Sequence, residues 1–296
     1  MNILITGGTG FIGSAVCKKL LENKNNNLTL LSRNPEKVKI PVKAISSLKQ
    51  LEKDESFDII INLAGEPIAD KRWTERQKHK IVTSRIDTTD KVIEFIKTAK
   101  NKPELLINGS AIGYYGIDKT DMEIDENGTG DNSFSSDLCK QWEATALQAN
   151  SFGVRTCLLR TGIVLGKNGG ALSKMLTPFK MGIGGKIGSG RQWMPWIHLH
   201  DLVGIILYCI EHDNLNGAIN GTSPNPLTNQ DFTKTLGKVL NRPTFMSVPR
   251  TIIKLLMGQM GVELLLSGKK ILPVKITEKG YQFQYPELDS ALQNIV

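Results

Sequence analysis

The stretch Met1-Asn-Ile-Leu-Ile-Thr-Gly-Gly-Thr-Gly-Phe-Ile-Gly13 places a short apolar strand directly before three regularly spaced glycines. Gly7 permits a sharp turn, Gly10 lets the backbone approach a pyrophosphate, and Gly13 lets the following helix pack closely on the sheet. A helix from about Ser14 would present unpaired N–H groups and the positive end of its dipole to the phosphates. The stretch therefore predicts a dinucleotide-binding βαβ unit; the alternative is a glycine-rich turn without a ligand.

Short apolar, β-branched runs alternate with helical patterns through the first half of the chain. Strands are expected at Asn2–Thr6, Leu28–Ser32, Val42–Ile45, Asp58–Leu63, Leu105–Ser110 and Thr156–Arg160. Helices are expected between them, at Ser14–Glu22, Glu75–Lys100 (as one helix or two) and Ser135–Asn150. This alternation is typical of an α/β fold with a doubly wound parallel sheet of the Rossmann type.

The pattern changes after Leu165. Residues 166–190 are rich in glycine and show few helix or strand cues, which predicts a long loop-rich insertion. A helix is expected after Asp201. Helices are also expected at Asn229–Leu240 and Arg250–Leu266, and these two do not fit a continuing parallel sheet.

We therefore expect two parts. Residues 1–165 would form the nucleotide-binding Rossmann core. Residues 166–296 would supply a substrate-side loop region and a smaller, mostly helical C-terminal lobe, with some elements returning to the core. Near the end, Tyr281, Phe283 and Tyr285 occupy alternate positions, which predicts a strand face that packs inward rather than a ligand site.

The composition is ordinary for a soluble globular enzyme, with 40% hydrophobic and 22% charged residues among 296. No apolar run reaches the ~18 residues of a membrane span. Met1 leads straight into the first strand, which leaves no room for a signal peptide. The four cysteines are scattered and lack the spacing of metal ligands, so we expect reduced thiols, no metal site, no membrane partner and a cytoplasmic location.

The net charge is +8, from 37 basic and 29 acidic residues. Nucleic-acid binding favours a clustered basic stripe with interleaved aromatics, whereas these lysines are spread over helix faces. A diffuse positive field can still attract an anionic cofactor or substrate. We expect a small-molecule substrate and no nucleic acid, and a homodimer stays open.

The end of the second strand distinguishes NAD from NADP. An acid at that point would accept hydrogen bonds from the ribose 2′-hydroxyl, whereas arginine accommodates a 2′-phosphate. The chain reads Leu30-Leu31-Ser32-Arg33-Asn34, without an acid. Ser32 can donate to a phosphate oxygen and Arg33 can add charge and a planar fork, which favours NADP(H) over NAD. The alternative is that Arg33 is simply a solvated residue after the strand.

Three motifs resemble the extended short-chain dehydrogenase/reductase superfamily: Thr6-Gly-Gly-Thr-Gly-Phe-Ile-Gly13, Asn62-Leu-Ala-Gly65, and Ser110 with Tyr114-Tyr115-Gly116. Further stretches are similar to its NAD(P)-dependent epimerase/dehydratase-like subfamily, whose substrate is unassigned. They are Asn62-Leu-Ala-Gly-Glu-Pro67, Ser110-Ala-Ile-Gly-Tyr-Tyr-Gly116, Gly182-Ile-Gly-Gly-Lys-Ile-Gly-Ser-Gly-Arg-Gln-Trp193 and Trp196-Ile-His198. The resemblance covers nearly the whole chain and implies an NADP(H)-binding Rossmann protein.

The resemblance also implies a set of cofactor-binding residues. Arg85 would brace the site or the cofactor, with a surface salt bridge as the alternative, and the backbone near Val164 would meet the nicotinamide carboxamide. The full set is Gly7, Thr9, Gly10, Phe11, Ile12, Gly13, Ser32, Arg33, Leu63, Ala64, Gly65, Arg85 and Val164.

Catalysis in the superfamily uses a serine, a tyrosine and a lysine four residues after the tyrosine. Here Ser110 and Lys140 match, but Ser136 stands where the tyrosine belongs. Tyr114 or Tyr115 could supply the phenol, or Lys140 could bind the ribose without proton chemistry or be an exposed helix residue.

The substrate side is expected to include three residues from the later motifs. Arg191 would bind an anionic group, Trp193 would line the pocket, and His198 would act as an acid or base. The alternative for His198 is that it only packs between the two parts of the chain. Two functions stay open: an NADP(H)-dependent oxidoreductase or epimerase-like enzyme for a small polar carbonyl or alcohol such as a nucleotide-sugar, or a non-catalytic NADP(H)-binding sensor or regulatory protein.

Overall fold

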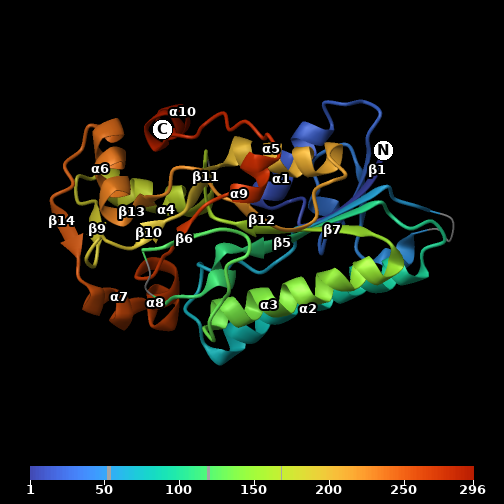
Figure 1. Cartoon of the computed structure of the whole chain (residues 1–296), viewed down its shortest axis with the longest axis horizontal. Coiled ribbons are helices and arrows are strands. Elements are labelled where there is room, and N and C mark those ends of the chain that lie inside the picture. The colour runs from blue at the N-terminus through green and yellow to red at the C-terminus, as the bar shows by residue number, and fades with distance from the viewer. Residues whose placement is uncertain (52–54, 119–120, 168) are drawn as a thin grey trace.

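The computed structural model describes residues 1–51, 55–118, 121–167 and 169–296. Its centre is a parallel sheet of seven strands in the order β12-β7-β5-β4-β1-β2-β3 (Figure 1). The strands are β1 Asn2–Thr6, β2 Asn27–Leu31, β3 Lys43–Ile45, β4 Ile59–Asn62, β5 Leu105–Ala111, β7 Arg155–Thr161 and β12 Gly217–Gly221. The chain runs outward from β1 to β3, returns to β4 on the other side of β1, and continues to β12. This doubly wound order confirms the predicted fold class and places a switch point between β1 and β4.

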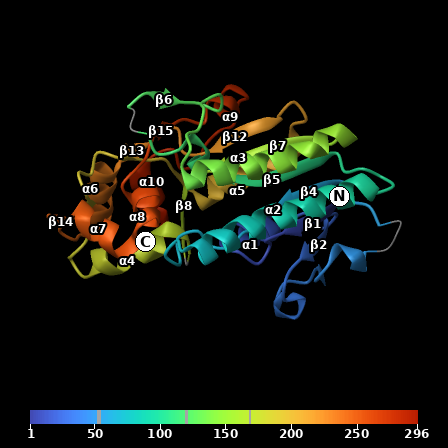
Figure 2. The ribbon, with the colours of Figure 1, turned by 90° about the horizontal axis from the view of Figure 1, so that it is seen from below.

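Helices cover both faces of the sheet, as Figure 1 shows above and below it. They are α1 Phe11–Leu20 and α5 Leu199–Glu211 on one face, and α2 Glu75–Thr98 and α3 Phe134–Leu147 on the other. Side chains alternate along each strand, so Ile3 and Ile5 join the core under α1 and α5, whereas Leu4 joins the core under α2 and α3. Figure 2 shows α2 and α3 side by side across the sheet. The expected helix at Glu75–Lys100 is thus a single helix.

The remaining elements form a smaller layer at the left end of Figure 1, except for α9 Val274–Glu278, which contacts β12. Part of this layer packs around the fully buried Trp196 and Phe232, with Leu172 and Leu292 against them, and Met260 packs in a separate cluster with Trp73 and Leu138. The elements are β6 Glu123–Ile124, β8 Ile163–Gly166, α4 Gly170–Lys180, β9 Gly185–Ile187, β10 Trp193–Met194, β11 Trp196–His198, β13 Leu227–Thr228, α6 Asn229–Leu240, β14 Met246–Val248, α7 Arg250–Met257, α8 Gln259–Leu265, β15 Lys270–Ile271 and α10 Leu288–Ile295. Short 3-10 turns are η1 Pro35–Lys37, η2 Leu48–Gln50, η3 Ile112–Tyr115 and η4 Gln148–Phe152.

Two expectations for the helices and loops of the second half were wrong in detail. The predicted loop at 166–190 contains α4 and β9, because Leu172 and Phe179, seven residues apart, bury one helix face in the second core. The predicted helix Arg250–Leu266 is two helices, since Gly258 adopts a φ of 60° between α7 and α8.

The segment with three alternate aromatics packs inward as expected but is irregular rather than a strand. Two of its backbone N–H groups donate to a carboxylate rather than to a neighbouring strand. Gln284 N and Tyr285 N donate to the two carboxylate oxygens of Asp201, at 2.7 and 2.9 Å.

Within the described residues, no helix has the length and apolarity needed to cross a bilayer.

Candidate cofactor and active site

The glycine turn after β1 has the geometry that a pyrophosphate needs. Gly7 has a φ of 71°, and a Cβ there would lie 2.6 Å from the carbonyl carbon of Leu63. A Cβ on Gly13 would lie 2.2 Å from the carbonyl oxygen of Gly7. Helix α1 begins at Phe11, three residues before the expected start, and no described side chain caps it. Its first N–H groups therefore remain available at the carboxyl edge of the sheet.

A chain of buried hydrogen bonds fixes the turn after β4 beside this loop. Thr6 Oγ1 donates to Asn62 Oδ1 at 2.5 Å and accepts from Ala64 N at 3.1 Å. Asn62 Nδ2 in turn donates to Thr89 Oγ1 and Asn108 Oδ1, at 2.8 and 2.6 Å. The sequence prediction missed Thr6, Asn62 and Asn108 as structural determinants of the site. Polar residues at the ends of apolar strands were the available signal.

Arg85 lies beneath the same turn. Its Nη1 donates to the carbonyls of Glu66 and Ile81, at 3.1 and 3.0 Å, and its guanidinium lies 5.2 Å from the Trp142 ring centroid. A Cβ on Gly65 would lie 2.9 Å from the guanidinium carbon. Burial lowers the pKa of Arg85 from its usual value. These contacts are those of a bracing residue rather than of a surface salt bridge.

The other expected cofactor residues lie along the same edge. Ser32 follows β2, where its N–H donates to the carbonyl of Ile45 at 2.9 Å, and Arg33 beside it is exposed. The ring of Phe11 packs against the segment that follows β8, since a Cβ on Gly169 would lie 2.4 Å from its Cδ2. Val164 is buried within β8 itself. Thr9 is exposed on the turn, and Ile12 is half-buried in the first turn of α1.

A buried ion pair lies directly under Ser110. The Ser110 hydroxyl donates to Glu143 Oε1 at 2.6 Å. Arg160 binds both carboxylate oxygens of Glu143, through Nε at 2.8 Å and Nη2 at 2.9 Å. Ser110, Glu143 and Arg160 are each at most 5% exposed. Although burial opposes the charged form, the hydrogen bonds and charge of Glu143 raise the pKa of Arg160, so the guanidinium group stays charged.

The two tyrosines after β5 differ in what their hydroxyl groups bind. Tyr115 is fully buried, donates to Asn220 Oδ1 at 2.7 Å and accepts from Arg160 Nη1 at 3.0 Å. Burial raises the pKa of Tyr115 to about 12. Tyr114 is half-buried with its ring centroid 3.4 Å from the Arg160 guanidinium, and its hydroxyl has no hydrogen-bond partner in the described part of the chain. Tyr114 is therefore the phenol free to meet a ligand.

The helix expected to carry the tyrosine and lysine has no room for the tyrosine. Ser136 is fully buried, and its hydroxyl donates to the Tyr114 carbonyl at 2.8 Å. A Cβ on Gly130 would already lie 2.3 Å from this hydroxyl. Lys140 extends to the carbonyl of Asp131, with the Asp137 carboxylate 3.8 Å away. Its ammonium group is thus held by the loop that precedes α3.

The three expected substrate residues make different contacts. Arg191 is exposed after β9, and Trp193 in β10 donates from Nε1 to Asp121 Oδ1 at 3.3 Å. His198 lies at the start of α5, where Nδ1 accepts from His200 N at 3.1 Å, and its ring is 4.0 Å from that of Tyr285. Burial, followed by the charge of His200, lowers the pKa of His198 to about 4. No group of described residues has the arrangement of a metal site.

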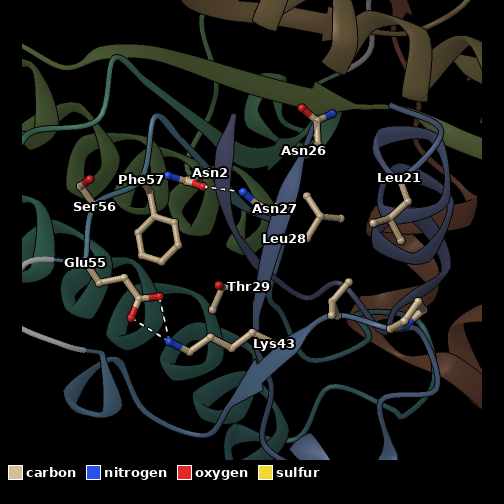
Figure 3. Close-up of a pocket in the computed structure, with 12 residues that line it drawn as sticks. Asn2, Leu21, Asn26, Asn27, Leu28, Thr29, Lys43, Glu55, Ser56 and Phe57 are labelled. Carbon is tan, nitrogen blue, oxygen red and sulfur yellow. Dashed lines mark hydrogen bonds and ion pairs between the residues drawn. The ribbon is translucent and has the colours of Figure 1, made fainter. Parts of the chain in front are cut away.

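A cavity of about 520 Å³ opens at the opposite, amino edge of the sheet (Figure 3). It lies where β1, β2 and β3 begin, with Asn27 Nδ2 donating to Asn2 Oδ1 at 3.1 Å and Lys43 paired with Glu55 at 2.7 Å. Because the glycine turn follows the carboxyl end of β1, this cavity is separate from the candidate cofactor site.

The switch point, the glycine cradle and the open helix terminus define a Rossmann-type dinucleotide-binding protein. The chain belongs to the NAD dependent epimerase/dehydratase family, whose model matches residues 3–220. A domain of unknown function matches residues 248–295.

Similar proteins span the full length of the chain. The epimerase family protein SDR39U1 of Mus musculus is 39% identical over 300 residues, covering 100% of both chains. YfhF of Bacillus subtilis is 36% identical over 301 residues, covering 100% of this chain and 98% of that protein. A crystal structure of human SDR39U1 (isoform 2) with NADPH has a TM-score of 0.89 at 36% identity, covering 100% and 99%. A nucleoside-diphosphate sugar epimerase from Corynebacterium glutamicum has a TM-score of 0.78 at 27% identity, covering 99% of this chain and 57% of that one.

Proposed function

We propose that this chain binds NADP(H) and acts as an oxidoreductase or epimerase-like enzyme on a small polar carbonyl or alcohol, such as a nucleotide-sugar. The observation that carries the proposal is the cradle in which Cβ atoms on Gly7 or Gly13 would collide with backbone atoms at the uncapped start of α1. Such a cradle leaves space and N–H donors for a pyrophosphate. The relative crystallised with NADPH has the same fold over the whole chain, which supports this assignment.

The residues on the carboxyl edge fit the parts of NADP(H). The turn after β1 would hold the pyrophosphate, and Ser32 and Arg33 would hold the 2′-phosphate. The turn Leu63–Gly65, braced by Arg85, would lie beneath the adenosine, and the backbone near Val164 would bind the carboxamide. When bound, NADP(H) supplies hydride chemistry that the amino acids cannot supply themselves.

For proton transfer, the contacts of the two phenols favour Tyr114 over Tyr115. The Tyr115 hydroxyl is occupied by Asn220 and Arg160. The ammonium group of Lys140 donates to the backbone carbonyl of Asp131. In our proposal Ser110, fixed by Glu143, orients the substrate oxygen, and Tyr114 or a water molecule exchanges the proton.

A second function is favoured by one observation, the buried Ser136 in place of the usual catalytic tyrosine. A protein that keeps the cofactor site but lacks a proton donor would be an NADP(H)-binding sensor or regulatory partner. Turnover assays with a panel of carbonyl compounds separate the two functions.

The cofactor assignment is tested by calorimetric titration with NADPH and NADH. Because charge-assisted bonds contribute about 1.5–3 kcal/mol, Arg33→Ala should weaken NADPH binding roughly 10- to 100-fold and leave NADH binding unchanged. Arg76→Ala, which removes an exposed arginine from α2, is the matched control. Equal loss for both cofactors, or none for either, would show that Arg33 does not contact a 2′-phosphate.

The catalytic assignment is tested by following NADPH absorbance during turnover. Tyr114→Phe should remove most activity while NADPH affinity stays constant, because only the hydroxyl is lost. Tyr115→Phe controls for loss of a phenol at the neighbouring position. Tight NADPH binding without turnover on any carbonyl, in the wild-type chain, would favour the sensor function.

A further inference from the structure

Seven large apolar side chains are exposed at the end of the molecule formed by the region around β9, β14 and α7 (Figure 1). Phe245 is 81% exposed, Leu255 75% and Leu256 66%. Eleven large apolar residues are exposed in the described chain, and seven of these eleven lie in two short segments, 181–183 and 245–256. We call these seven the tip patch: Met181, Ile183, Phe245, Met246, Ile252, Leu255 and Leu256.

The local structure explains why these side chains are exposed. Strands β9 and β14 pair in parallel with Gly185 opposite Met246, so Ile183 and Phe245 both precede the same paired end. Helix α7 buries Ile253 on one side, where a Cβ on Gly261 of α8 would lie 2.7 Å from its Cγ2. On its other side, Ile252, Leu255 and Leu256 have the i, i+3, i+4 spacing of a single helix face.

The same part of the chain is strongly basic. Residues 167–200 and 232–262 contain no Asp or Glu but carry ten basic residues: Lys167, Lys174, Lys180, Lys186, Arg191, Lys234, Lys238, Arg242, Arg250 and Lys254. These ten exceed the net charge of +8 for the whole chain. Lys174 pairs with Asp70 and Lys238 with Asp289. The basic residues on the elements that carry the tip patch are Lys180 at the end of α4, Lys186 in β9, Arg242, whose Nε donates to the Lys180 carbonyl, and Arg250 and Lys254 in α7.

We infer that the tip patch docks on an anionic lipid bilayer. An apolar face flanked by Lys and Arg binds in the headgroup region, where apolar side chains enter the acyl boundary and the cations meet anionic headgroups. A second copy of this chain is a poor occupant, since it would place two basic surfaces against each other. Side chains as exposed as those of Phe245 and Leu255 can enter the acyl boundary without displacing other parts of the chain. Such peripheral contact needs no membrane span.

The test is flotation of the full chain with vesicles of phosphatidylcholine alone or with one third phosphatidylserine. The wild-type chain should float only with the anionic vesicles and should be released by high salt. The double variant Leu255→Gln/Leu256→Gln should partition at least about ten-fold more weakly, from the apolar area lost. Lys254→Gln should reduce partitioning about five-fold. Leu147→Gln, on an exposed leucine of α3, is the matched control and should leave partitioning unchanged.

Three results would overturn the inference: equal flotation with both vesicle types, no flotation with either, or variants that match the control. If the double variant instead converts a dimer to a monomer in light scattering, the tip patch is an interface between copies and the bilayer assignment is wrong. NADPH titration of every variant separates this proposal from the cofactor assignment, because the tip patch lies outside the glycine cradle.

Discussion

Replacing His198 with asparagine should remove a specific part of the dependence of stability on pH. His198 is 6% exposed, accepts a hydrogen bond from the His200 N–H at 3.1 Å, and packs on Tyr285. Protonation would remove this acceptor and place a charge in a buried position. Burial, followed by the charge of His200, therefore lowers the pKa of His198 from its ordinary value of 6.5 to about 4.

The sign follows from which state binds the proton. Between pH 6.5 and about 4 the unfolded chain is protonated at His198 and the folded chain is not, so acid favours unfolding. The contribution is fully present above pH 6.5 and is lost progressively as the pH falls toward about 4. Linkage gives a loss of about 2 kcal/mol in the free energy of unfolding between pH 7.5 and pH 5.

Urea unfolding at these two pH values measures the effect. Asparagine does not titrate and is itself a favourable N-cap, so His198→Asn keeps the start of α5 while removing the proton site. Comparing the two proteins cancels shared groups, such as Asp201, whose pKa is raised by burial. The wild-type chain should lose about 2 kcal/mol more than the variant on acidification. Equal losses in the two proteins would refute the burial argument and reopen His198 as a group that titrates near neutral pH.

Three further predictions concern the candidate site. Gly13→Ala should lower the free energy of unfolding by about 1–3 kcal/mol and weaken NADPH binding, because the new Cβ would lie 2.2 Å from the Gly7 carbonyl oxygen. Urea unfolding measures the first effect and calorimetry the second, with Ser14→Ala as the control. Glu143→Ala should cost about 3–5 kcal/mol in urea unfolding, because it leaves the Arg160 charge buried and unpaired. The exposed Glu94→Ala should cost below about 1 kcal/mol, and similar losses for the two would contradict the burial argument. Lys140→Ala should change NADPH affinity by less than about two-fold in calorimetry, since the ammonium group binds the Asp131 carbonyl; a larger loss would place Lys140 on the cofactor.

The fold was predictable where the determinant is local. The spacing of Gly7, Gly10 and Gly13 after an apolar strand predicts the turn, because the steric demand for glycine acts over a few residues. Strand β12 escaped prediction, since Gly217-Ala-Ile-Asn-Gly221 has weak strand propensity and is extended because it pairs with β7. Helix α4 was missed because it begins with glycine and contains Pro178.

The candidate site was less predictable because the residues that contact one another in it are distant in sequence. Glu143 and Arg160 lie 17 residues apart on a helix and a strand, and no short motif announces their contact. A charged residue inside an apolar strand, as in Thr156-Cys-Leu-Leu-Arg160, was the available signal. For His198 the residue type alone left acid-base chemistry and packing both open, and the structure adds that burial lowers its pKa to about 4.

The buried pair also explains how a site can be ordered without a tyrosine at position 136. An ion pair buried this deeply contributes little net stability, because the desolvation penalty offsets the attraction. Its contacts, however, reach several groups of the candidate site: Arg160 touches both tyrosines, and Glu143 accepts from Ser110. Satisfied buried networks fix side-chain geometry. In the proposed enzyme, Arg160 on β7 therefore orders the substrate side of the sheet edge, and the only phenol whose hydroxyl this network leaves unbound is Tyr114 within the described residues.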